Sequence, residues 1–146
     1  MAALVALAVA VPFTSADPPD ETTALDPALS ALPAGTKVVD DWGWGGYFMW
    51  RYPQLDLMMH GYGDTFTTDE LRRNTALITL SPGWEESLHA SGTRVALLRP
   101  WSRLAIVLGQ QGWRTVRESD DFVLLRAPVS WQSDGAAVAP GFGSAG

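Results

Sequence analysis

A histidine and three of the four aspartates between residues 40 and 64 have side chains placed for acid–base chemistry. Asp40 ends a predicted strand and Asp41 follows it, whereas His60 follows a second predicted strand and precedes Asp64. If the two strands are parallel, the loops after them meet at the carboxyl edge of the sheet, where α/β proteins usually bind ligands. His60 would then be a general base oriented by Asp40, or one ligand of a metal ion. The same cluster also fits a hydrogen-bonded brace between loops, so His60 and Asp40 are catalytic candidates rather than an identified pair.

The sequence offers few further residues for such a site. His89 is the only other histidine and falls on a predicted helix, and the chain contains no cysteine. Without thiols there is no disulfide, thiol catalysis, zinc ribbon or iron–sulfur cluster. No G-x-S-x-G motif marks a serine nucleophile. We therefore expect no metal and no cofactor, and no catalysis by this chain on its own.

Aromatic side chains crowd the same region of the sequence. Indole and phenol rings beside aspartate and arginine suit the faces and hydroxyl groups of a sugar, although rings are also an efficient way to fill a small core. On a helix, Tyr47, Trp50 and Arg51 share one side, so we expect some rings to be exposed. The candidate ligand-binding residues are Asp41, Trp42, Trp44, Tyr47, Trp50, Arg51, Tyr62 and Asp64.

Glycines separate the first predicted strand from the helix after it. A strand, a glycine-rich turn and a helix form the layout that binds phosphates through backbone N–H groups. The spacing Gly43-x-Gly45-Gly46, however, is neither G-x-G-x-x-G nor a P-loop. We interpret these glycines as permitting a sharp turn and close packing of helix on strand.

The elements that must position these residues alternate along the chain. Strand and helix patterns alternate through three strands, and a hairpin follows, which predicts a small, mostly parallel sheet of about five strands with an antiparallel C-terminal hairpin and helices packed on it. A capping-box pattern, Thr67 to Glu70, begins one of the helices. The predicted strands are 37–40, 55–59, 94–98, 113–118 and 122–126, and the predicted helices are 26–32, 47–52, 67–80, 83–90 and 102–111.

Composition divides the chain of 146 residues into four parts. Hydrophobic residues make up 47% and charged residues 18%, which permits one packed core. We expect an apolar anchor or the stump of a transmembrane helix over 1–14, a linker with a short helix over 15–33, a soluble α/β domain over 34–128 and a disordered tail over 129–146. The net charge is −6 and no basic cluster occurs, so nucleic acid is not an expected partner.

The apolar N-terminus indicates export or membrane attachment. Residues 2–13 are almost wholly apolar, but a membrane-spanning helix needs about 20 such residues. The segment is therefore either the core of a signal peptide, with small residues at 14–16 as a cleavage site, or the outer half of a transmembrane helix. Both place the rest of the chain outside the cytoplasm, so we expect the protein at the cell membrane with its soluble part extracytoplasmic.

Several short motifs resemble one family. These motifs lie in the segments 33–39, 41–47 with Trp50 and Arg51, 61–64, 82–85, 112–113 and 124–126. Through them, the stretch 34–128 resembles the C-terminal extracytoplasmic domain of bacterial polytopic membrane proteins related to the protein-O-mannosyltransferase-like, lipid-phosphate-sugar-dependent glycosyltransferases. One departure is His60-Gly61-Tyr62, where many relatives carry Asp-Gly-Arg.

This resemblance implies a function outside the chemistry itself. Such proteins keep catalysis in membrane-embedded helices near the lipid carrier, so the chain is expected to be a non-catalytic accessory domain that packs on a transferase's membrane region or positions its acceptor. Two alternatives stay open: an exported glycan- or glycolipid-binding protein, and a small hydrolase or transferase using His60 and Asp40. One pocket holding both residues would favour the enzyme, an exposed face of Trp and Tyr would favour binding, and buried rings without a pocket would leave only a structural cap.

Overall fold

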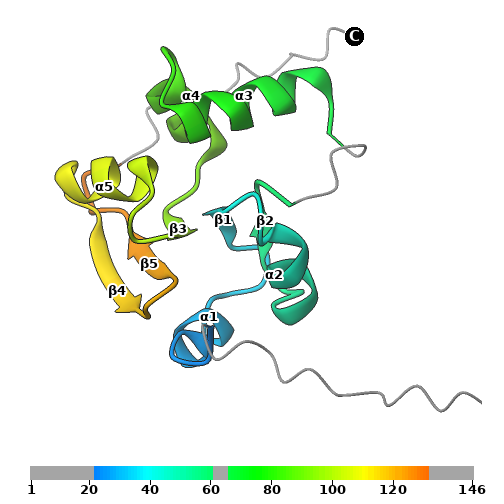
Figure 1. Cartoon of the computed structure of the whole chain (residues 1–146), viewed down its shortest axis with the longest axis vertical. Coiled ribbons are helices and arrows are strands. Elements are labelled where there is room, and N and C mark those ends of the chain that lie inside the picture. Colours follow the sequence, from blue (N-terminus) through cyan, green and yellow to red (C-terminus); the bar gives the residue numbers. More distant parts are fainter. Residues whose placement is uncertain (1–21, 61–65, 132–146) are drawn as a thin grey trace, which may run out of the picture.

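The computed structural model describes residues 22–60 and 66–131 of the chain (Figure 1). The expected N-terminal anchor, Tyr62, Asp64 and residues 132–146 of the expected C-terminal tail lie outside these residues, whereas Trp131 at the start of that tail packs against the core and stacks on His89. No helix in the described ranges is long and apolar enough to span a membrane. The elements are α1 (Asp26–Ser30), β1 (Lys37–Asp40), α2 (Gly45–Arg51), β2 (Asp56–Leu57), α3 (Thr68–Thr79), α4 (Trp84–Ser91), β3 (Val95–Leu98), α5 (Arg103–Gln110), β4 (Arg114–Glu118) and β5 (Val123–Arg126).

The five strands form one mixed sheet in the order β2-β1-β3-β5-β4. β1 pairs in parallel with β2 and β3, and β5 pairs antiparallel with β3 and β4. The register places Asp40 opposite Leu97 and Leu97 opposite Leu124. The predicted fold class, with parallel strands first and a C-terminal hairpin last, is confirmed.

Helices cover both faces of the sheet because successive strand residues point to opposite faces. On one face, Val38 and Leu97 pack in a buried cluster with Leu29 of α1 and Phe48 of α2. On the other face, the strands pack against α3, α4 and α5, which contribute the buried residues Leu77, Leu88, Leu104 and Leu108. The helix after β1 and the helix after β3 therefore lie on opposite faces of two neighbouring strands.

Two predicted elements differ from those observed. The predicted second strand shrinks to Asp56–Leu57, although the Met58 amide still donates to the Val38 carbonyl at 2.9 Å. Asp26-Pro27 has the sequence of an N-cap followed by proline at the first helical position, but the first helix begins at Asp26 with Leu25 as its N-cap residue, so Asp26 does not cap it. The Asp26 carboxylate instead accepts hydrogen bonds from Arg51 and from the Tyr52 hydroxyl, both at the end of α2. Long-range contacts thus replace the local cap.

The predicted cap of α3 is confirmed. The Glu70 amide donates to Thr67 Oγ1 at 3.3 Å, and the Thr67 amide donates to Glu70 Oε2 at 2.7 Å. Ser102 caps α5 in the same way, because its Oγ accepts a hydrogen bond from the Ala105 amide at 3.2 Å. This cap fixes where α5 begins, directly after the loop that follows β3.

The outer strands of the sheet are short or charged. β2 has two residues, whereas β4 has five that are all exposed. The pairing of β4 with β5 shifts register between Thr115 and Arg117, which marks a bulge at this edge.

Candidate functional site

Asp40 is a buried carboxylic acid at the end of β1. Its side chain is completely shielded from solvent, and its Oδ1 accepts a hydrogen bond from the Met59 amide at 2.8 Å. Its Oδ2 has no hydrogen-bond partner among the described residues. Burial raises the pKa of Asp40 to about 7, against the opposing effect of the Met59 hydrogen bond. Asp40 thus ties the end of β1 to the chain after β2.

Gly45 allows this close approach between α2 and the chain after β2. A Cβ at this position would lie 2.5 Å from both the His60 Cα and the Met59 carbonyl oxygen, and 2.8 Å from Asp40 Oδ2. Only glycine fits such a gap without displacing backbone. The interpretation of the glycines as close packing of helix on strand is confirmed at this residue.

His60 and Asp40 line different cavities. The half-buried His60 ring stacks on Phe66, with ring centroids 4.3 Å apart, and lines a cavity of about 550 Å³ bounded by β2, α3 and α4. Asp40 lines a smaller cavity of about 250 Å³ at the carboxyl ends of β1 and β3. The two side chains therefore do not share the single pocket that would have favoured an enzyme using both residues.

Asp41 and Trp42 also line the smaller cavity. Asp41 Oδ1 accepts a hydrogen bond from the Gly43 amide at 3.0 Å, and the Trp42 ring lies 5.8 Å from Phe66. We call this the switch-point cavity, and its walls include Asp40, Asp41, Trp42, Leu98, Ser102 and Arg103. In the part of the chain that the structure describes, no group of three or more His, Asp or Glu residues is placed to hold a metal ion.

Four of the remaining rings form a continuous surface with an arginine. Ring centroids are 6.2 Å apart for Trp50 and Tyr47, and 5.8 Å apart for Tyr47 and Trp44. The Arg99 guanidinium then lies 5.1 Å from the Trp44 ring and 5.4 Å from the Trp101 ring. Trp50 is 72% exposed and Trp101 is 62% exposed. We call these residues the aromatic strip: Trp44, Tyr47, Trp50, Arg99 and Trp101.

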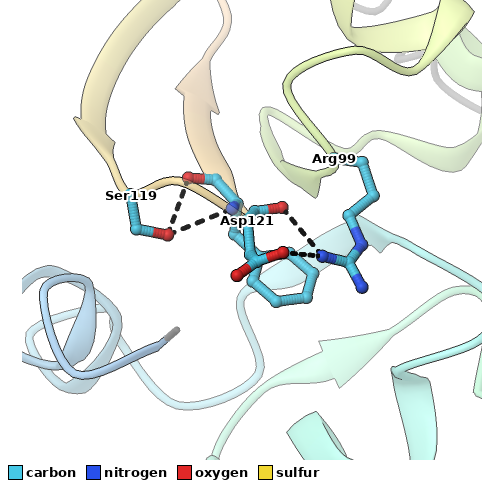
Figure 2. A network of polar contacts seen from close by, with 4 residues as sticks. Arg99, Ser119 and Asp121 are labelled. Atoms are coloured by element: carbon cyan, nitrogen blue, oxygen red, sulfur yellow. Dashed lines mark hydrogen bonds and ion pairs between the residues drawn. The ribbon is translucent and has the colours of Figure 1, made fainter. Parts of the chain in front are cut away.

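Arg99 is held in place by the hairpin between β4 and β5 (Figure 2). Its Nη1 donates to Asp121 Oδ1 at 2.6 Å, and its guanidinium lies 4.5 Å from the Phe122 ring centroid. The turn itself is closed by Ser119, whose amide donates to the Phe122 carbonyl at 2.8 Å and whose Oγ accepts from the Phe122 amide at 3.1 Å. The arginine therefore presents a fixed cation between rings rather than a mobile side chain.

The end of α2 is anchored to α1. Arg51 Nη2 donates to Asp26 Oδ2 at 2.6 Å, and the Tyr47 hydroxyl hydrogen-bonds Thr22 Oγ1 at 3.1 Å. Arg51 is thus engaged in holding two helices together. Of the residues predicted to bind a ligand, the structure places Trp44, Tyr47 and Trp50 on one surface and Asp41 and Trp42 at a separate cavity.

Sequence reasoning did not identify Arg99, Trp101, Ser102 or Arg103 as site residues. Their only signal is position, because they follow β3 at the same edge as the residues after β1. No family model, curated protein or solved structure matches this chain in the comparisons with known proteins.

Proposed function

We propose that this chain is a non-catalytic extracytoplasmic accessory domain of a membrane glycosyltransferase-like protein, and that the aromatic strip packs on the membrane region. The resemblance of residues 34–128 to such domains supports the first part of the proposal. The second part rests on the exposure of Trp50 and Trp101 at the two ends of one surface. Membrane attachment through the apolar N-terminus belongs to the same proposal.

The exposed indoles are the observation that carries this function. A tryptophan keeps its large apolar face in water at a cost, and its N–H suits a boundary that is apolar on one side and wet on the other. Tryptophan and tyrosine accordingly concentrate at membrane–water interfaces, and tryptophan, tyrosine and arginine concentrate at the centres of protein interfaces. The aromatic strip combines these three residue types on one surface.

The second candidate function is an exported protein that binds a glycan or glycolipid. It is favoured by the pairing of Tyr47 with Trp50, whose ring is open enough to stack on a sugar face. A small hydrolase or transferase using His60 and Asp40 has less support, because the two residues line different cavities.

Photo-crosslinking from the strip separates the first two functions. In the full chain, expressed in bacterial membranes, p-benzoylphenylalanine replaces Trp50 or Trp101, and a matched variant carries it in place of Ile106. Ile106 is 49% exposed on α5, which packs on the other face of the sheet. The proposal predicts that positions 50 and 101 label lipid or a polytopic membrane protein several-fold more than position 106.

Equal labelling from all three positions would contradict docking through the strip. Glycan binding predicts a different result, namely saturable shifts of the Trp50 indole N–H resonance when soluble oligosaccharides are added. A Trp50→Ala/Trp101→Ala double variant that still folds should lose whichever of these contacts is real.

A further inference from the structure

The switch-point cavity lies where α/β sheets commonly bind small molecules. β1 and β3 are neighbours in the sheet, but α2 follows β1 on one face and α5 follows β3 on the other. A crevice opens outside the carboxyl ends of two strands wherever their connections diverge in this way. Here the crevice is a cavity of about 250 Å³, just below the roughly 300–1,000 Å³ of pockets for drug-sized ligands. Its size suits a metabolite-sized molecule.

The two sides of the cavity carry opposite charges. The β1 side holds the carboxylate of Asp41, and the α5 side holds the guanidinium of Arg103. Asp41 uses Oδ1 to accept from Gly43, and no described residue forms an ion pair with Arg103 within 4.0 Å. The charges of the two sides are therefore not neutralised by each other.

A further observation adds to the positive potential on the α5 side. The helix α5 begins there, with Ser102 Oγ capping the Ala105 amide. The first N–H groups of a helix have no partner within it, so the amides of Arg103 and Leu104 add positive potential on the side where Arg103 stands.

We propose that the switch-point cavity binds a small zwitterion, with its ammonium group on the Asp41 side and its carboxylate or phosphate group on the Arg103 side. The apolar part of such a molecule would lie against Trp42, Leu98 and Leu104, which also line the cavity. A simple anion would face the Asp41 carboxylate, and a simple cation would face Arg103 and the start of α5. A molecule carrying both charges meets a complementary group on each side.

Matched ligands test this assignment directly on the whole chain by nuclear magnetic resonance. L-Leucine carries both charges, 3-methylbutylamine lacks its carboxylate, and 4-methylpentanoate lacks its ammonium. Phosphoethanolamine tests phosphate in place of carboxylate. We expect the Trp42 indole N–H and the Arg103 amide to shift saturably with leucine or phosphoethanolamine, at concentrations at least about tenfold lower than with either singly charged analogue.

Charge-removing variants then assign each end of the ligand. Arg103→Gln should weaken the zwitterion about tenfold and leave 3-methylbutylamine unaffected, whereas Asp41→Asn should weaken the zwitterion similarly and leave 4-methylpentanoate unaffected. Asparagine keeps the oxygen that accepts from Gly43, so the turn is preserved. Arg117→Gln, on the exposed strand β4, is the matched control and should change neither affinity.

Three outcomes would overturn the assignment. They are the absence of saturable shifts with either zwitterion at 10-fold molar excess and above, equal affinity for zwitterion and singly charged analogue, and stronger binding of methyl glucoside than of either zwitterion. This inference does not rest on the aromatic strip, because Trp50→Ala should abolish docking through the strip and leave zwitterion binding unchanged.

Discussion

Asp40 ends β1 and Arg99 directly follows the neighbouring strand β3, yet these two ionisable side chains differ in burial and in their partners. Asp40 is fully buried, and a backbone amide is its hydrogen-bond donor. Arg99 is partly exposed, paired with Asp121 and surrounded by the rings of Trp44, Trp101 and Phe122. Asp121 and the surrounding rings thus balance the charge of Arg99, whereas burial raises the pKa of Asp40 and favours its neutral form. The comparison teaches that Asp40 makes the end of β1 rigid, whereas Arg99 holds exposed rings in place after β3.

The largest effect on stability is expected at Gly45, where α2 packs against Asp40 and the chain after β2. Gly45→Ala introduces a methyl group 2.5 Å from backbone atoms of Met59 and His60, so it should lower the free energy of unfolding by more than about 3 kcal/mol. Urea denaturation followed by circular dichroism measures this loss. Gly109→Ala is the matched control, because a Cβ there meets nothing within 4 Å on α5, and it should raise stability by up to about 1 kcal/mol.

The acid itself should make stability depend on pH. Its pKa is raised to about 7 in the folded protein from 3.8, so the folded state binds the proton more tightly than the unfolded state does. Its contribution to stability is complete below about pH 4, falls as the pH rises toward 7 and is then lost. Asp40→Asn should remove this dependence, with an effect on the order of 2 kcal/mol between pH 5 and pH 8. Thermal unfolding of both proteins across that range measures it, and parallel curves would show that Asp40 does not titrate there.

Removing the charge of Arg99 should lower the free energy of unfolding by less than the changes at Gly45 and Asp40 do. Arg99→Gln breaks the ion pair with Asp121 and the ring contacts, and we expect a loss of about 1 kcal/mol because the pair is partly shielded from water. Arg72→Gln breaks the pair with Asp69, whose side chains are 74% and 73% exposed, and should cost less than about 0.5 kcal/mol. Chemical denaturation of the two variants compares the pairs, and equal losses would mean that the rings around Arg99 add nothing.

The smallest effect on stability should come from the most exposed ring. Trp50→Ala should change the free energy of unfolding by less than about 0.5 kcal/mol, because 72% of the side chain already faces solvent. Phe48→Ala, two residues earlier and fully buried, should cost about 3–5 kcal/mol. A large loss from the Trp50 change would mean that this ring supports the fold rather than contact with another molecule.

The sequence predicts the order of elements well and their limits less well. Apolar runs, turn residues and the Thr67–Glu70 capping box are local signals, and these predict the sheet and the start of α3. The second strand is shorter than its apolar run because β2 is an outer strand with a partner on one side only. Asp26 looks like a helix cap in sequence, but its partners Arg51 and Tyr52 lie 25 and 26 residues away.

The candidate sites are also predicted only in part, because some of their residues are brought together by contacts between distant parts of the sequence. The density of rings in 42–52 identifies one half of the aromatic strip, since those residues share a helix and its preceding turn. The other half comes from the loop after β3 and is fixed by Asp121, which lies 22 residues from Arg99. His60 and Asp40 both follow predicted parallel strands, but they line different cavities. Asp40 accepts its hydrogen bond from the Met59 amide rather than from the His60 ring.

The two outer strands determine whether another protein chain can pair with the sheet. An open strand edge offers unpaired N–H and C=O groups, and a neighbouring chain can add to it as a further strand and so seed fibres. β2 is too short to serve as such a template, and β4 carries Arg114, Arg117 and a bulge that interrupts regular pairing. Growth of the sheet from one molecule into the next is therefore discouraged at both borders. A partner must recognise the side chains of this protein rather than extend its backbone ladder.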